Sequence, residues 1–196
     1  MSQITVNRDV DGISGLCVIE PTVHGDSRGY FMETYKESDF KEAGLNYSFV
    51  QDNQSFTARK GTLRGIHFQN APYAQAKLVR VTRGAVLDVA VDIRRGSPTY
   101  GRYVAVELSQ SNNRQLLIPK GFAHGFAVMS REALFQYKCD EYYHPEAECG
   151  LDLLDPVLGI DWKMPIQDAV LSDKDRKWKS FADFDTPFEY KKTDIR

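Results

Sequence analysis

Side chains that can bind ligands or move protons gather in four short stretches of the chain. These are residues 26–31 with Glu33, residues 51–53, residues 63–69 with Lys77 downstream, and residues 119–126. The third and fourth stretches contain one histidine each, His67 and His124. An imidazole serves either as a proton-transfer group or as a metal ligand, so these two uses must be separated.

The pattern of the two histidines argues against a metal centre. Residues 119–126 carry Pro-x-Gly-x-x-His, which resembles the second signature motif of the cupin superfamily. Metal-binding cupins carry a His-x-His pair and a carboxylate at their first motif, whereas residues 65–69 here contain a single histidine. Zinc, iron and manganese normally need three or more side-chain ligands. We therefore expect proton chemistry with no metal and no other cofactor.

Six short strings, in order, resemble one enzyme family. They are residues 63–68, 75–77, 88–94, 121–126, 155–156 with 161–162, and 171–175. Together they resemble dTDP-4-dehydrorhamnose 3,5-epimerase, which makes a precursor of dTDP-L-rhamnose, over residues 19–181. A single string is weak support, but six in order at compatible spacings are strong. The resemblance implies inversion at C3 and C5 of dTDP-4-dehydro-6-deoxy-D-glucose, giving dTDP-4-dehydro-L-rhamnose.

The resemblance implies four catalytic residues: His67, Tyr137, Lys77 and Asp175. A hydrogen beside a ketone is weakly acidic, so its removal needs a base and a group that stabilises the enolate oxygen. An imidazole with the ordinary pKa of about 6.5 suits the base, which Asp175 would orient, and Lys77 would stabilise the oxygen. A phenol with a pKa of about 10 keeps its proton at neutral pH, so Tyr137 suits the proton donor.

The resemblance also implies a substrate-binding set. Its members are Arg28, Glu33, Gln51, Asn53, Arg64, Asp88, His124, Tyr143 and Glu148. The diphosphate of the substrate needs cations, and Arg64 is the natural candidate because a guanidinium fork suits phosphate. In this set, Tyr143 would stack on the thymine ring, and Asp88 with His124 would form a supporting polar pair.

Several of these residues have a plainer alternative role. Asp175 follows Ser172 by three residues, so it could simply cap the first turn of a helix. Tyr137 shares the strand parity of Phe135, and its alternative role is packing in the core. Asp88 lies opposite the apolar parity of its strand, where a side chain would ordinarily face solvent.

Arg64 and His67 pose a geometric problem. They have opposite parity, so a regular strand would point them to opposite faces. Both are expected in one site. A bulge or kink at Gly65 would reconcile the two, and this is a prediction about the strand.

Short strands separated by turn residues dominate the middle of the chain. Strands are predicted at residues 77–81, 87–93, 104–108, 116–118 and 133–139. A short helix is predicted over residues 38–44, and another begins at residues 172–175. Arg94 and Arg95 are interpreted as solvated charge at a turn. The pattern predicts an all-β, cupin-type antiparallel jelly roll with short peripheral helices.

Length and composition fit one domain over residues 1–196, with N-terminal strands in about 1–35 and a helical segment in about 170–196. A net charge of −2 with mixed signs gives no indication of nucleic-acid binding. No apolar run approaches the ~20 residues that span a membrane. Three cysteines without a CxxC pair, and no signal-peptide pattern, favour the cytoplasm.

The expected partners are a dTDP-sugar and a second copy of the chain. In the family that the chain resembles, N-terminal strands cross to a partner subunit, and residues 13–22 could do so here. Three alternatives stay open: a single-site (C3 or C5) epimerase on a related nucleotide sugar, a metal-dependent cupin enzyme, and a non-catalytic sugar-binding jelly roll. Loss of activity with a chelator would indicate the metal-dependent enzyme. A function that survives replacement of His67, Lys77 and Tyr137 would indicate the non-catalytic jelly roll.

Overall fold

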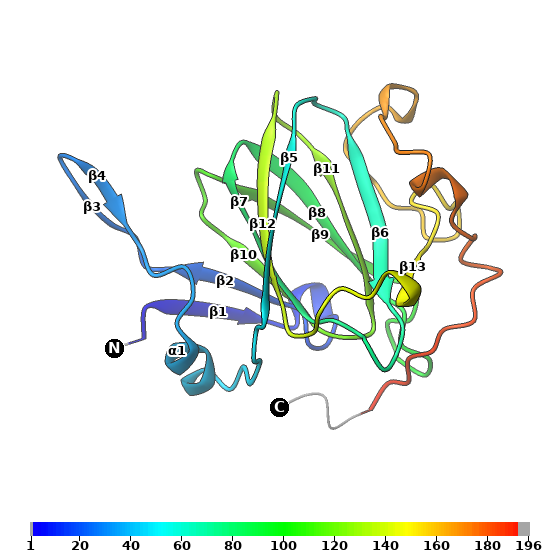
Figure 1. The fold of residues 1–196 in the computed structure, drawn as a ribbon, viewed down its shortest axis with the longest axis horizontal. Coiled ribbons are helices and arrows are strands. Elements are labelled where there is room, and N and C mark those ends of the chain that lie inside the picture. Colours follow the sequence, from blue (N-terminus) through cyan, green and yellow to red (C-terminus); the bar gives the residue numbers. More distant parts are fainter. Residues whose placement is uncertain (1, 192–196) are drawn as a thin grey trace.

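Two antiparallel sheets form the body of the protein. The computed structural model describes residues 2–191. The first sheet contains, in spatial order, β1 (Ile4–Arg8), β2 (Cys17–Pro21), β10 (Gln115–Ile118), β7 (Lys77–Arg83), β12 (Ala133–Cys139) and β5 (Gln51–Thr57). The second contains β13 (Glu148–Gly150), β6 (Leu63–Gln69), β11 (Phe122–Val128), β8 (Ala85–Asp92) and β9 (Tyr103–Ser109). The sheets face each other (Figure 1), which confirms the predicted all-β jelly roll.

Apolar side chains from both sheets fill the space between them, and alternation along each strand decides which residues take part. In β8, Val86 and Ala90 belong to this inner cluster, whereas Leu87 and Val89 face the other way. That other face is also covered, because the segment that follows β13 packs Trp162 and neighbouring side chains onto it. Both faces of β8 are therefore buried.

This covering overturns the plainer interpretation of Asp88. The apolar parity of β8 faces the C-terminal segment, so Asp88 shares the inner face with Val86 and Ala90. Its side chain is 0% exposed rather than solvent-facing. Alternation alone could not identify the inner face, because a strand that is buried on both sides hides its polar residue from that pattern.

The helices are short and lie outside the sheets. α1 spans Glu37–Glu42, so it begins one residue earlier and ends two residues earlier than predicted, and Gly44 follows it with φ of +72°. The 3₁₀ turns are η1 (Val10–Gly12), η2 (Pro145–Ala147), η3 (Ile166–Asp168) and η4 (Asp175–Lys177). Within residues 2–191, the structure has no helix of sufficient length and apolarity to cross a membrane.

The C-terminal segment is less helical than expected. η4 is its only helical turn between residues 170 and 191, and residues 192–196 lie outside the described part. The helix cannot continue because the chain turns extended at Trp178, with φ of −69° and ψ of 153°. There it forms a parallel bridge between Lys179 and Leu151.

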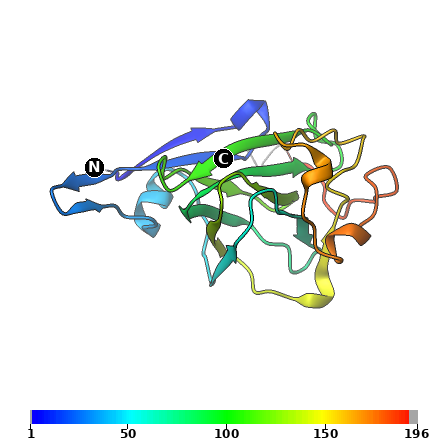
Figure 2. The same ribbon diagram turned by 90° about the horizontal axis from the view of Figure 1, so that it is seen from above.

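The N-terminal strands stay with their own chain in this structure. β2 pairs with β1 on one side and with β10 on the other, so residues 17–21 are enclosed in the first sheet. The part that leaves the body is the hairpin of β3 (His24–Asp26) and β4 (Gly29–Phe31). Figures 1 and 2 both show this hairpin projecting beyond the sheets.

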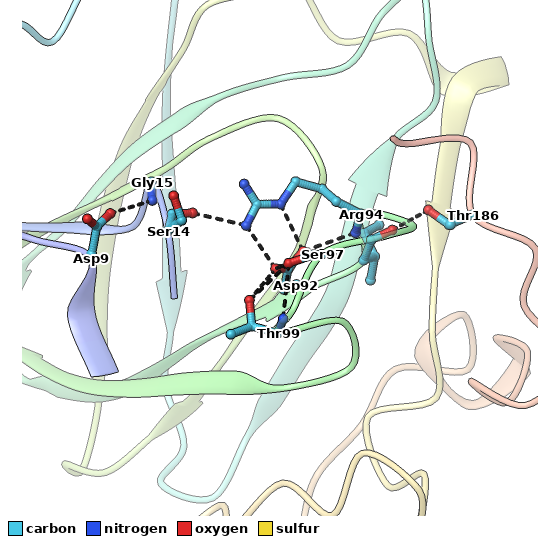
Figure 3. Close-up of polar contacts among 9 residues, drawn as sticks. Asp9, Ser14, Gly15, Asp92, Arg94, Ser97, Thr99 and Thr186 are labelled. Carbon is cyan, nitrogen blue, oxygen red and sulfur yellow. Dashed lines mark hydrogen bonds and ion pairs between the residues drawn. The ribbon is translucent and has the colours of Figure 1, made fainter. Parts of the chain in front are cut away.

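Arg94 is buried, so its interpretation as solvated charge is wrong. The side chain lies at the end of β8, and the residue is 3% exposed. Its Nε and Nη2 donate to the two carboxylate oxygens of Asp92 at 2.9 and 2.8 Å. Nη2 also donates to the carbonyl oxygen of Ser14 at 3.0 Å, and Ser97 and Thr99 hydroxyls donate to Asp92. Figure 3 shows this cluster between the N-terminal turn and the C-terminal tail.

Candidate active site

Two adjoining cavities open between the sheets. The larger, of about 500 Å³, is lined by β5, β6, β7, β11, β12 and residues 170–175. The smaller, of about 290 Å³, has Gln51, Asn53, Tyr143 and Glu148 on its wall. Both cavities are also lined by the same three predicted catalytic residues: His67, Lys77 and Tyr137. These three side chains therefore lie where the two cavities meet.

A bulge in β6 turns Arg64 and His67 toward the same cavity, as predicted. His67 pairs with His124 and Arg64 with Phe126, so three steps along β6 match two steps along β11. The extra residue shifts the parity of the strand, and both side chains line the larger cavity. Gly65 adopts φ of +111°, and a Cβ atom there would lie 2.6 Å from the His124 carbonyl oxygen. A side chain at this position would therefore clash with β11.

His67 and Asp175 form a close pair. His67 Nε2 lies 2.6 Å from Asp175 Oδ1, and the Ser172 hydroxyl donates to Asp175 Oδ2 at 2.8 Å. The Asp175 backbone N–H also donates to Ser172 Oγ at 3.1 Å, so the turn role and the pairing role occur together. Burial would raise the pKa of Asp175, but the hydrogen bonds with His67 and Ser172 outweigh it and lower the pKa. Nδ1 is then the imidazole nitrogen left to accept a proton.

Lys77 and Tyr137 come from neighbouring strands, β7 and β12. Burial lowers the pKa of the Lys77 ammonium, although the nearby acidic groups Asp88 and Glu148 oppose this change. Burial also raises the pKa of the Tyr137 phenol, which keeps its proton more firmly at neutral pH. The Tyr137 ring packs 6.0 Å from that of Phe135, between ring centroids, while it lines both cavities. Packing and access to the site are therefore compatible.

Asp88 and His124 form a second buried pair on the adjacent strands β8 and β11. Both Asp88 carboxylate oxygens lie 3.0 Å from His124 Nε2. Burial raises the pKa of Asp88, and His124 opposes the rise. His124 lines the larger cavity, whereas Asp88 is 0% exposed. Asp88 thus supports the cavity wall through His124.

The smaller cavity presents aromatic, amide and acidic groups. The Tyr143 hydroxyl donates to Glu148 Oε2 at 2.5 Å, which raises the pKa of Tyr143 to about 12. The Tyr143 backbone N–H donates to Gln51 Oε1 at 3.0 Å, and Gln51 Nε2 donates to Asn53 Oδ1 at 2.9 Å. These bonds link four of the predicted binding residues to one another.

Lys174 belongs to the site but was absent from the predicted set. It lines the larger cavity, and its Nζ lies 2.5 Å from Glu148 Oε2. Like Arg64, it offers a cation on the cavity wall where a diphosphate could bind. The sequence signal was its position immediately before Asp175 in the Ser-x-Lys-Asp string.

Two predicted residues lie apart from the rest. Arg28 is in the projecting hairpin, where it pairs with Asp26 at 2.5 Å and has a side chain that is 88% exposed. Glu33 follows β4, and one of its carboxylate oxygens lies 3.6 Å from Lys36 Nζ. Neither residue lines the two cavities. The hairpin that carries Arg28 extends away from the body of its own chain, and Glu33 lies in the segment that follows it.

Potential metal ligands do not cluster in the part of the chain that the structure describes. Across residues 2–191, no three or more histidine, cysteine, aspartate or glutamate side chains are grouped so that they could hold a metal ion. Cys17, Cys139 and Cys149 are all free thiols.

Known proteins match this chain along most of its length. A family profile described as dTDP-4-dehydrorhamnose 3,5-epimerase matches residues 11–183. The protein of that name from Pseudomonas aeruginosa is 54% identical to this chain, over 88% of this chain and 94% of its own length. The protein of that name from Methanothermobacter thermautotrophicus is 52% identical to this chain, over 85% of this chain and 90% of its own length. A Legionella pneumophila crystal structure, an epimerase with dTDP-4-keto-L-rhamnose, is 46% identical with a TM-score of 0.90, over 96% of this chain and 99% of that one. The resemblance predicted from the six strings is confirmed: the chain belongs to the dTDP-4-dehydrorhamnose 3,5-epimerase family.

Proposed function

We propose that the chain inverts C3 and C5 of dTDP-4-dehydro-6-deoxy-D-glucose to give dTDP-4-dehydro-L-rhamnose. The observation that carries this proposal is the meeting of His67, Lys77 and Tyr137 at the junction of the two cavities. A base, a cation and a proton donor are the three groups that epimerisation beside a ketone requires. Membership of the family supports the same substrate and the same isomerase activity.

The reaction divides between these groups. Nδ1 of His67 takes the proton from the carbon beside the ketone, and the C–H electron pair moves into the enolate. Asp175 stabilises the imidazolium that forms, because its low pKa keeps the carboxylate charged. The Lys77 ammonium stabilises the enolate oxygen. Tyr137 then donates its proton to the opposite face of the carbon, and exchange with solvent restores the tyrosine and the histidine.

The nucleotide part of the substrate fits the smaller cavity. Tyr143 offers a ring for stacking on thymine, and Gln51 and Asn53 offer amides to the base. Arg64 and Lys174 line the larger cavity and would bind the diphosphate. This arrangement directs the keto sugar toward His67. The proposal includes no metal ion and no other cofactor.

The proposal also includes a homodimer that acts in the cytoplasm. The hairpin exposes Tyr30 and Phe31 at 61% and 66%, which is unusual for aromatic side chains on a free surface. Arg28 and Glu33 lie on and beside this hairpin, away from the cavities of their own chain. Insertion of the hairpin against a second copy would cover both rings. It would also bring Arg28 and Glu33 to the partner's cavity.

Hydrogen exchange tests the reaction directly. The protein is incubated with dTDP-4-keto-6-deoxyglucose in heavy water, and deuterium in the recovered sugar is located by NMR. Deuterium at both C3 and C5 is the expected result. Deuterium at one carbon would indicate a single-site epimerase, and the absence of exchange would refute the epimerase proposal. A His67→Asn variant controls for exchange that the buffer catalyses.

A further inference from the structure

Trp178 forms a wall beside the His67–Asp175 pair. Its ring centroid lies 5.8 Å from that of His67, and the two ring planes meet at 68°. The indole packs directly on Gly150 of β13, where an added Cβ atom would lie 2.7 Å from the indole Cε2. Gly150 pairs with His67 in the β13–β6 register. The indole therefore lies against the strand pair that carries the imidazole.

The backbone after Trp178 is tied to the same sheet. Lys179 forms a parallel bridge with Leu151, and its carbonyl oxygen accepts the Asp152 N–H at 2.8 Å. Trp178 is thus held between η4, which begins with Asp175, and this bridge. The indole has a fixed position rather than that of a free surface ring.

The indole N–H of Trp178 lacks an ordinary partner. Nε1 is buried, and no residue in the described part of the chain accepts its hydrogen with normal geometry. The polar group that it influences is the Asp175 carboxylate: burial raises the pKa of Asp175, and Trp178 acts with His67 and Ser172 to lower it. By contrast, the other tryptophan, Trp162, donates to the Leu153 carbonyl oxygen at 2.8 Å. A buried N–H without a full partner is costly, so its placement requires an explanation.

We propose that Trp178 is a positioning residue for proton transfer, which holds the imidazole of His67 edge-on and shares the Asp175 carboxylate with it. This inference rests on the proposed function, because it assigns His67 as the base. The ring limits tilting of the imidazole, so that Nδ1 keeps its direction. The N–H draws part of the carboxylate's charge, so that less of that charge acts on the imidazolium.

Other charged and titratable groups line the same cavities as the pair. They are Arg64 on β6, Lys77 on β7, His124 on β11, Tyr137 on β12, Tyr143 before η2, Glu148 on β13 and Lys174 before η4. Of these, Lys174 lies against the indole, with its Nζ 5.9 Å from the Trp178 ring centroid. The variant that reports the indole N–H alone is therefore one that keeps an aromatic ring beside Lys174.

A Trp178→Phe variant isolates the N–H, because it keeps an aromatic ring. Without the N–H, more of the Asp175 charge is available to the imidazolium, so His67 gains a proton more readily. We expect the midpoint of the His67 titration to rise by about half a pH unit, the equivalent of one modest hydrogen bond. The acid limb of the kcat/KM profile should move to higher pH by the same amount.

A Trp178→Ala variant also removes the ring. We expect kcat to fall by about 10-fold, because orientation of the base is lost, and KM to rise by a smaller factor, because Lys174 loses the ring beside it. Trp162→Phe is the matched control: it removes an indole N–H from the core and should leave both the titration and the kcat unchanged once the folded fraction is equal.

NMR titration of His67, assigned with a His67→Asn variant, and steady-state kinetics are measured on the full chain. The inference would be overturned if the midpoint of the His67 titration in Trp178→Phe equals that of the wild type. It would also be overturned if the loss of kcat in Trp178→Ala is fully explained by a loss of thermal stability. The NMR titration needs no substrate. An inactive wild-type protein would therefore refute the proposed function, while the titration would still decide whether Trp178 tunes the pair.

Discussion

At the scale of single residues, Tyr137 has two separable tasks. Its ring packs beside Phe135, and the residue lines both cavities, where its hydroxyl is the group that could donate a proton. Phenylalanine can replace the ring but cannot donate a proton. The packing task and the chemical task can therefore be measured apart.

We expect a Tyr137→Phe variant to exchange the substrate's hydrogen with heavy water but to invert few molecules. His67 can still remove the proton and return one from solvent on the same face, whereas the opposite face has lost its donor. The ratio of inversion to exchange should fall by about 100-fold, the scale of general acid catalysis. NMR of the recovered sugar measures both quantities.

The matched control for this prediction is Tyr143→Phe. Tyr143 loses its bond to Glu148 in the smaller cavity, away from the proposed proton donor. KM should rise while the ratio of inversion to exchange stays that of the wild type. If Tyr137→Phe keeps the wild-type ratio, another group donates the proton.

At the scale of elements, the bulge in β6 is the feature that assembles the site. We predict that Gly65→Ala destabilises the fold by about 3 kcal/mol or more, because it adds a steric clash with β11 to a positive φ. Gly96→Ala is the control: φ there is +80°, but an added Cβ meets nothing within 4 Å. Gly96→Ala should lower the unfolding free energy by only about 1 kcal/mol.

Denaturant unfolding measures both changes, and kinetics on the folded fraction tests alignment. Folded Gly65→Ala should lose activity because Arg64 and His67 no longer share a cavity, whereas Gly96→Ala should keep full activity. Equal destabilisation of the two variants, with activity intact in both, would show that the bulge is unimportant.

Strand alternation predicted most of the elements but not all of their surroundings. β7, β8, β9, β10 and β12 all overlap predicted strands. Parity, together with the expectation that Arg64 and His67 share one site, predicted a bulge or kink at Gly65, and the register of β6 contains a bulge. Alternation failed at Asp88, and the position at a turn misled at Arg94, since both residues are buried by chain segments that are distant in sequence. Alternation distinguishes the two faces of one strand, but the segments that cover those faces lie far away in the sequence.

At the scale of the whole molecule, the Asp92–Arg94 pair connects distant parts of the chain. Arg94 reaches the Ser14 carbonyl oxygen in the N-terminal turn, and its guanidinium lies over the Tyr190 ring at 5.1 Å in the C-terminal tail. Burial would raise the pKa of Asp92, but hydrogen bonds from Arg94, Ser97 and Thr99 lower it overall. Folding therefore favours the charged carboxylate.

This predicts a specific pH dependence of stability. Asp92→Asn should lower the unfolding free energy by about 3–5 kcal/mol at pH 7, because it leaves a buried guanidinium unpaired. A depressed folded pKa contributes stability above the unfolded value of about 3.8, and that contribution disappears as pH falls below it. The difference in unfolding free energy between wild type and Asp92→Asn should therefore narrow from pH 4 downward.

The control is Arg95→Met, at an exposed neighbouring residue, which should change the unfolding free energy by about 0.5 kcal/mol at most. If the difference in unfolding free energy between wild type and Asp92→Asn stays constant with pH, the charged Asp92 carboxylate does not stabilise the fold as predicted.

The proposed dimer makes each active site depend on two chains, and mixed dimers can test this. One chain carries Arg28→Ala and Glu33→Gln in and beside the hairpin, and the other carries His67→Asn in the cavity. Each variant alone should be nearly inactive. In a mixed dimer, the hairpin variant's intact cavity receives the intact hairpin of the His67→Asn chain, so one of its two sites is complete. Random mixing makes about half of the dimers mixed, so about a quarter of wild-type activity should return. If the hairpin served its own chain, mixing would restore nothing.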